Sequence, residues 1–260
     1  MQSDFTPIIF NTPWENDCIE LYFIHDLHNG SAQHDAQKWT ALKREIIANK
    51  RAYCVFVGDA MENAIPNSKG DVFYQTMPPH EQKMWFKDQL VDLKHQTIAV
   101  LDGNHEKNRS TKTCGMFPLY DACVMAGIEN LYRPHFALVD IGVGTRSDTA
   151  KNTKQVRYVG YLVHRATSQV KFCSADMLEG IDFFAYGHDH QPVDRPRGKL
   201  IYDPQNKKLR QKDVEVINCG SFLTYGGYAS DAGYRVSAKK LYKLILFGCE
   251  KKIQSVGFHV

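Results

Sequence analysis

Long hydrophobic runs and paired cysteines are both missing from this sequence. No stretch approaches the roughly 18–20 apolar residues that a membrane-spanning helix needs. The first residues, Met-Gln-Ser-Asp-Phe-Thr-Pro, show neither the basic region nor the apolar core of a signal peptide. The 7 cysteines are scattered singly, with no Cys-x-x-Cys pair, which indicates reduced thiols rather than a disulfide framework. We therefore expect a cytoplasmic protein with no membrane partner.

A strong net charge and compositional bias are also absent. The formal charge of +3 is too small to require a polyanionic partner, and the chain has no internal repeat, low-complexity tract or clear linker. A length of 260 residues with 43% hydrophobic residues suits one large α/β domain or two small ones. We take residues 1–260 as a single domain.

Apolar runs alternate with helical patterns in the first hundred residues. Three runs have the length and the β-branched or aromatic character of buried strands: 20–25, 53–57 and 97–101. Helices are predicted over about 34–49 and from Pro79 to about Lys94, whereas residues 62–76 are predicted to form a loop. This alternation predicts βαβ units and a largely parallel sheet.

The second half of the chain is richer in strand patterns. Residues 136–143 and 156–163 are predicted to pair across a polar turn, and Asp203-Pro-Gln-Asn206 suits the tip of a hairpin. Further strands are expected at 181–186, at 214–217 and from about residue 234 onward, and helices at 117–126 and 174–179.

Metal-binding side chains follow five of the predicted strands. They are Asp26 and His28, then Asp59, then Asn104 and His105, then His164, then His188 and His190. The stretch Gly103-Asn-His-Glu106 taken alone could be an ordinary polar turn. In an open α/β sheet, however, strand C-termini converge on one edge, where ligand sites form. The Asp-x-His and His-x-His spacings are informative because residues i and i+2 of extended backbone point the same way.

The ligand types favour particular metals and a count of two. Carboxylate, imidazole and amide groups suit Mn, Fe, Zn or Ni, and they lack the thiolates of a structural zinc site. Even seven of these eight groups exceed what one ion takes from protein in an open site, so they suit two ions that share a bridging carboxylate. Two ions roughly 3.5–4 Å apart can hold a hydroxide between them and clamp a phosphate for in-line displacement.

The ordered motifs carry a resemblance to a known family. Asp26-x-His28, Gly58-Asp59, Gly103-Asn-His-Glu106, His164 and Gly187-His-x-His190 together resemble the calcineurin-like metallophosphoesterase superfamily. The segment Asn218-Cys-Gly-Ser221 is similar to the Asn-Pro-Gly-Ser that often follows, with Cys219 in place of proline. The loop at 62–76 looks like that of small stand-alone members encoded by bacteria and their phages.

This resemblance implies a fold and a role for each matched residue. The implied fold is α/β, a four-layer α/β/β/α sandwich of two mixed sheets flanked by helices. The first metal would be bound by Asp26, His28 and His190, and the second by Asn104, His164 and His188, with Asp59 bridging both. His105 would lie near the leaving-group oxygen as general acid or transition-state stabiliser, and Glu106 would hold its ring. The expected metals are two divalent ions, Mn first, with Fe, Zn and Ni as alternatives.

Several nearby residues allow more than one interpretation. Arg165 follows His164 where the family usually has glycine, and His135 is the most obvious rival ligand, although it precedes a strand rather than ending one. His25 is expected to pack on the opposite face from Asp26. Asp189 is expected to point away from the metals, and Asp102 is left without a role.

Substrate contacts are less well defined by the sequence. Asn104 and Arg109 are candidate substrate-binding residues. The guanidinium of Arg109 could recognise phosphate bidentately, and a solvated loop arginine is the alternative. The basic run from Arg195 to Lys212 could track a nucleic-acid backbone or form a solvated hairpin face. Residues 225–228 could line the pocket or simply form a turn.

These observations together predict a binuclear metal-dependent phosphoesterase that uses a metal-bridged hydroxide. Phosphodiester substrates such as DNA, RNA or nucleotides are slightly favoured by the basic run over phosphomonoesters, including phosphoproteins. The alternative from another class is a non-catalytic binding module on the same fold, which typically lacks metal ligands or the histidine of Gly-Asn-His. The oligomeric state and any partner protein stay open.

Overall fold

Buried parallel strands with helices between them form the first half of the protein. In the computed structural model, which describes residues 4–66, 68, 72–146, 154–165 and 178–260, strand β2 (Cys18–Ile24) leads through α1 (Ala36–Ala48) to β3 (Ala52–Val57). The chain continues through α2 (Pro79–Asp92) to β4 (Thr97–Leu101). Strands β2, β3 and β4 pair in parallel, which confirms the predicted βαβ units.

These strands belong to a six-stranded mixed sheet. Its order is β13-β12-β2-β3-β4-β5, and β12 pairs antiparallel with both β13 and β2. The strands not yet introduced are β5 (Tyr132–Arg133), β12 (Leu241–Phe247) and β13 (Ile253–Phe258). All six residues of β3 are buried because both faces of this sheet are covered.

The second sheet is seven-stranded and also mixed. Its order is β1-β6-β7-β8-β11-β10, with β9 paired to β11. The strands are β1 (Ile8–Asn11), β6 (Phe136–Arg146), β7 (Lys154–Arg165), β8 (Phe183–Gly187), β9 (Val193–Asp194), β10 (Arg197–Asp203) and β11 (Lys208–Asn218). Strands β6 and β7 pair antiparallel as predicted. Strand β7 runs past the predicted end at residue 163, so His164 lies in the strand rather than after it.

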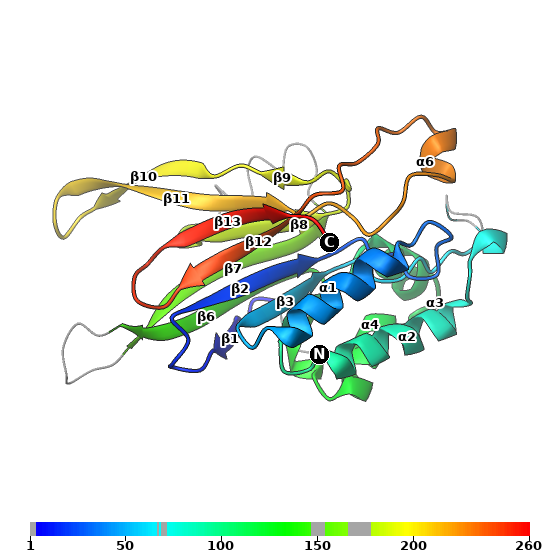
Figure 1. The fold of residues 1–260 in the computed structure, drawn as a ribbon, viewed down its shortest axis with the longest axis horizontal. Helices are drawn as coiled ribbons and strands as arrows, with labels where there is room; N and C mark the ends of the chain where they lie inside the picture. The colour runs from blue at the N-terminus through cyan, green and yellow to red at the C-terminus, as the bar shows by residue number, and fades with distance from the viewer. Residues whose placement is uncertain (1–3, 67, 69–71, 147–153, 166–177) are drawn as a thin grey trace.

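The main core lies between the two sheets, and helices cover the outer face of the six-stranded sheet (Figure 1). Side chains such as Phe23, Val55, Val139 and Phe183 fill the space between the sheets. A second cluster lies between the six-stranded sheet and helices α1, α2 and α4 (Pro118–Ala126) and includes Trp39, Phe56 and Phe86. Two mixed β-sheets flanked by helices confirm the predicted fold class. Part of the helix predicted at 174–179 lies outside the described residues.

Local signals explain where the covering helices begin. Asp35 caps α1 by accepting a 3.0 Å hydrogen bond from the backbone N–H of Lys38. Pro79 occupies the first turn of α2, where its missing N–H costs no hydrogen bond. Both helices are two to three residues shorter than the sequence predicted at their ends.

Short helical segments connect these elements. They are η1 (Val72–Tyr74), η2 (His105–Thr111), α3 (Lys112–Cys114), η3 (Glu129–Leu131) and α6 (Tyr228–Asp231). Segment η2 is a π-helix that begins shortly after the end of β4, and π-helical turns are frequent at functional sites. Across the described ranges, none of the helices combines the length and the apolar character that crossing a bilayer requires.

Candidate metal centre

The predicted ligands meet at the C-terminal ends of strands from both sheets. Asp26 and His28 follow β2, Asp59 follows β3, and Asn104 follows β4. His164 lies near the end of β7, while His188 and His190 follow β8. The structure brings all seven together because the parallel strands of both sheets end at the same edge of the molecule.

The backbone of this cluster is unusual. Five of the ligand candidates have a left-handed backbone: Asp26 (φ 51°), His28 (φ 46°), Asp59 (φ 48°), His188 (φ 79°) and His190 (φ 58°). This conformation costs a residue with a side chain roughly 1–2 kcal/mol. The expectation that Asp-x-His and His-x-His converge on extended backbone is therefore wrong: tight turns aim these side chains. Such strain concentrated in one place is a mark of functional sites.

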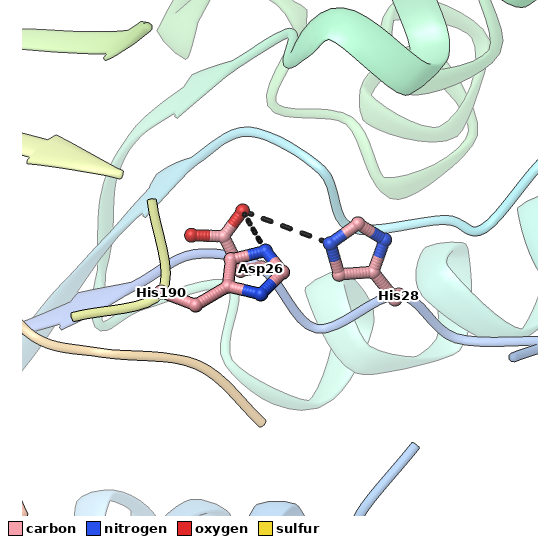
Figure 2. A group of neighbouring side chains, drawn as sticks. All are labelled: Asp26, His28 and His190. Carbon is pink, nitrogen blue, oxygen red and sulfur yellow. Dashed lines mark ion pairs between the residues drawn. The ribbon is translucent and has the colours of Figure 1, made fainter. Parts of the chain in front are cut away.

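The carboxylate of Asp26 offers one oxygen to the centre. Figure 2 shows that Oδ1 faces two imidazole rings, with His190 Nε2 at 3.5 Å and His28 Nε2 at 3.7 Å. This oxygen is buried and has no hydrogen-bond partner among the described residues. A buried carboxylate oxygen without a donor is costly unless a cation binds it.

The other oxygen of Asp26 is held by a residue that the sequence placed on the opposite face. His25 Nε2 accepts a 2.9 Å hydrogen bond from the Cys219 N–H, so the ring proton lies on Nδ1, which donates to Asp26 Oδ2 at 2.7 Å. The backbone N–H of His188 donates to the same oxygen at 2.9 Å. His25 therefore orients the first carboxylate instead of packing away from it.

The carboxylate of Asp59 also divides its oxygens between support and the centre. Oδ1 accepts a 2.8 Å hydrogen bond from the His105 N–H. Oδ2 faces three imidazole Nε2 atoms, with His164 at 3.1 Å, His105 at 3.7 Å and His28 at 3.9 Å. One carboxylate oxygen thus faces three imidazole rings, as a carboxylate that binds a metal ion together with histidines would.

The contacts of the His164 ring require a positive charge beside Nε2. Its Nδ1 donates to the Val57 carbonyl at 2.7 Å, so the neutral ring turns a lone pair on Nε2 towards Asp59 Oδ2 and towards Asn104 Oδ1, 3.2 Å away. These three atoms repel one another unless a proton or a cation lies between them. Without a metal, burial lowers the pKa of His164, but the charge of Asp59, its hydrogen bond and the charge of Asp26 together outweigh burial and raise the pKa to about 9.

Both carboxylates stay ionised in this environment. Burial alone would raise the pKa of Asp26, but the charge of His190 and hydrogen bonds from His190 and His25 hold it well below its usual range. Burial likewise opposes ionisation of Asp59, while the charges of His105 and His164 bring its pKa below the usual value. The centre is thus built to keep negative charge facing imidazole rings.

The donor atoms fit a metal ion. Three groups of side chains have ligand atoms within 4.8 Å of one another: Asp26, His28 and His190; His28, Asp59 and His105; and Asp59, His164 and His188. Carboxylate and imidazole donors suit first-row transition metals. The unpartnered Asp26 Oδ1 and the facing lone pairs at His164 show that these buried groups can hold a metal ion.

His105 is fixed by a residue that the sequence analysis missed. Its Nδ1 donates to the Glu62 carbonyl at 2.8 Å, and the Glu62 carboxylate lies 3.2 Å from His28 Nδ1 and 3.0 Å from the Arg109 guanidinium. Burial lowers the pKa of His105 to about 4 despite the nearby charge of Asp59. The available signal was the position of Glu62, three residues beyond Asp59 at the same strand end.

Glu106 does not hold the His105 ring, so that prediction is wrong. Its buried carboxylate accepts hydrogen bonds from three backbone N–H groups, those of Met61 and Gly103 at 2.9 Å and of Asp59 at 3.2 Å. The side chain turns back from η2 towards the strand ends, where it accepts hydrogen bonds from these three amides. Glu106 thus ties the end of β3 to the end of β4 and fixes the turn that carries Asp59.

The remaining candidates lie outside the three ligand groups. His135 is exposed and contacts Lys107 and Asp4. It belongs to none of the three ligand groups, so it does not replace His164 as a ligand. Asp189 accepts a hydrogen bond from Asn218. Asp102 turns towards Tyr132, whose hydroxyl donates to it at 2.6 Å, and burial raises the pKa of Asp102 to about 8.

A cavity of about 1570 Å³ opens over the centre. Its lining includes both proposed substrate contacts, Asn104 and Arg109, and the residues Tyr225, Gly226 and Gly227 from the segment before α6. The guanidinium of Arg109 is mostly buried and ion-paired with Glu62, so it is not a freely solvated loop arginine.

Fold and centre together define a mixed α/β protein with a candidate metal site at its strand ends. No protein-family model matches the chain, and no curated protein matches it. Among solved structures, Vps29 from Chaetomium thermophilum matches with a TM-score of 0.37 and 12% identity over 93% of this chain and 98% of that one. A likeness at this level carries no argument about activity.

Proposed function

We propose that the protein is a binuclear metal-dependent phosphoesterase. The observation that carries this proposal is the pair of carboxylate oxygens, Asp26 Oδ1 and Asp59 Oδ2, which both face the rings of His28 and His164 from adjacent strand ends. Asp26, His28 and His190 would hold one ion, and Asn104, His164 and His188 the other. Asp59 would be shared. Manganese is the first choice, with iron, zinc and nickel as alternatives.

Two bound divalent ions would supply Lewis-acid stabilisation of the charge that develops on phosphoryl oxygens. The chain itself would position the substrate. His105, held through Nδ1 by the Glu62 carbonyl, presents Nε2 to the cavity and would interact with the leaving-group oxygen. Asn104 and Arg109 would contact the phosphate, with the Arg109 side chain fixed by Glu62.

The substrate class proposed first is a phosphodiester, either nucleic acid or nucleotide. The cavity of about 1570 Å³ exceeds the roughly 300–1000 Å³ of typical small-molecule sites. Tyr225 and Tyr234 on its wall offer rings on which a base could stack. A phosphomonoester, including a phosphoprotein, is the alternative for the same centre.

The test is turnover of bis-p-nitrophenyl phosphate against p-nitrophenyl phosphate by chelator-treated protein reconstituted with Mn²⁺, Fe²⁺, Zn²⁺ or Ni²⁺. We expect metal-dependent diester hydrolysis that His188→Gln reduces at least a hundredfold, with His135→Gln as the matched control on an exposed histidine. Dominant monoester turnover would favour the alternative substrate. Stoichiometric metal binding without turnover of either ester would favour a non-catalytic binding module instead.

A further inference from the structure

Positive charge is concentrated in one short segment of this chain. Residues 195–212 contain seven of its 32 Lys and Arg residues and one of its 29 Asp and Glu residues, which gives the segment a formal charge of +6. The rest of the chain therefore carries −3. The net charge of +3 is therefore the sum of a strongly basic segment and an acidic remainder of the chain.

This element is the β10–β11 hairpin, which extends beyond the body of the two sheets (Figure 1). Strand β10 is the edge strand of the seven-stranded sheet, and only β11 pairs with it among the described strands. The two strands pair antiparallel from Arg197 opposite Val214 to Asp203 opposite Lys208. The ribbon is thus about 23 Å long, at roughly 3.3 Å per residue.

The register sorts the side chains of the hairpin onto two different faces. Side chains alternate along each strand, and directly paired residues share a face. One face carries all the strand cations, which are Arg197, Lys199, Lys208, Arg210 and Lys212. The opposite face carries Leu200, Tyr202 and Leu209, which are 74%, 58% and 67% exposed. Arg210 on this face is ion-paired with Asp203, and Lys212 is ion-paired with Asp182. The five cations outnumber these two acidic partners, so the face is a net cationic surface rather than an evenly solvated hairpin.

We propose that the cationic face of the β10–β11 hairpin binds the phosphate backbone of double-stranded nucleic acid. A two-stranded ribbon fits the roughly 12 Å width of a DNA major groove. Alternate residues on one strand lie roughly 6.6 Å apart, so successive cations can follow successive phosphates. As a statement about the substrate of the metal centre, this proposal rests on the proposed function. The binding itself needs no metal.

The separation of cations and apolar side chains onto opposite faces of the hairpin also favours nucleic acid over a lipid surface. A ribbon that inserted Leu200, Tyr202 and Leu209 into a bilayer would turn its cations away from the anionic headgroups. A nucleic acid engages the charged face directly and leaves the apolar side chains near the tip in solvent. Charge complementarity therefore selects the polyanion.

The test measures the affinity of the full chain for a short labelled DNA duplex, in EDTA, across a series of salt concentrations. The variant Lys207→Gln/Lys208→Gln/Arg210→Gln removes three exposed cations from the distal half of the hairpin. The matched control Lys50→Gln/Arg51→Gln/Lys94→Gln removes three exposed cations elsewhere. We expect the hairpin variant to bind roughly tenfold more weakly. Its slope of log K against log salt should fall by about 0.9 for each phosphate that the variant no longer neutralises.

Two further measurements keep the outcomes distinct. The hairpin variant should keep the thermal stability of the wild type and its turnover of bis-p-nitrophenyl phosphate, so an inactive wild type would overturn the proposed function without affecting the binding result. Equal DNA affinities for the hairpin and control variants would overturn this proposal. Binding to anionic vesicles that Leu200→Ser/Leu209→Ser abolishes, without salt-dependent DNA binding, would show that the hairpin serves a membrane instead.

Discussion

The Nε2 atom of His164 lies 3.1 Å from Oδ2 of Asp59. The Nδ1 proton of the same ring is donated to the Val57 carbonyl, so Nε2 of the neutral ring carries a lone pair and no proton. A lone pair therefore faces a carboxylate oxygen, and both side chains are buried. A second proton on His164 or a metal ion removes the repulsion, and binding of one displaces the other. Metal affinity should consequently fall as the pH drops, because protons compete for His164.

Divalent metal should stabilise the folded chain. At free metal 100 times the Kd, the gain is about 2.7 kcal/mol, which corresponds to a rise in Tm of about 5–10 °C for a chain of this size. Thermal unfolding in chelator and in Mn²⁺ measures it. His164→Gln should lose most of the rise, and His135→Gln should keep it. A Tm that none of the four candidate metals changes would argue against any metal centre.

His25→Leu should weaken metal binding although His25 is not a ligand. The change removes the donor that orients Asp26 Oδ2 and the acceptor for the Cys219 N–H. Loss of such a supporting partner typically costs about 10–100-fold in metal affinity. Competition with a metal-sensitive dye gives the value, and His25→Gln, which can donate and accept, should recover part of it. If His25→Leu bound metal as tightly as the wild type, His25 would not orient Asp26 for metal binding.

Glu106→Gln should destabilise the metal-free chain by about 1–3 kcal/mol, because an amide nitrogen must replace one of two oxygens that both accept backbone N–H groups. The Glu106 carboxylate accepts these hydrogen bonds from the backbone N–H groups of Asp59, Met61 and Gly103. Urea unfolding in chelator separates this effect from metal binding. The exposed Glu129→Gln serves as the control. If Glu106 instead held the His105 ring, stability would stay near that of the wild type and only turnover would fall.

Gly103→Ala should disrupt the turn that carries Asp59. A Cβ at residue 103 would lie 2.0 Å from Asp59 Oδ1 and 2.2 Å from its backbone nitrogen, so the strand ends must separate. Overpacking of this kind costs about 1–3 kcal/mol, and the metal-induced rise in Tm should disappear with it. The control is Gly198→Ala, whose nearest atoms lie at 3.4 and 3.6 Å, an ordinary contact. Equal unfolding midpoints for the two variants would contradict this account.

The sequence was a good guide to elements and a weaker guide to geometry. Apolar runs, helical spacing and the proline at residue 79 located β2, β3 and β4 and their helices within a few residues, since these signals are local properties of the chain. The extended backbone expected at Asp26-x-His28 was wrong, because a left-handed turn depends on what surrounds it. The same limit concealed Glu62, whose carboxylate meets His28 and Arg109 only when the segments that follow β2, β3 and β4 pack together.

What the sequence by itself determined is the chemistry of the centre. Carboxylates, imidazoles and an amide stand at five strand ends, and parallel strands must end on a common edge. What only the tertiary structure decided is which atoms face one another. His164 and Asp59 are more than a hundred residues apart, and Glu106 bonds backbone amides rather than His105. Packing of the two sheets sets those contacts, because the distance between side chains on different strands is not a local property of the chain.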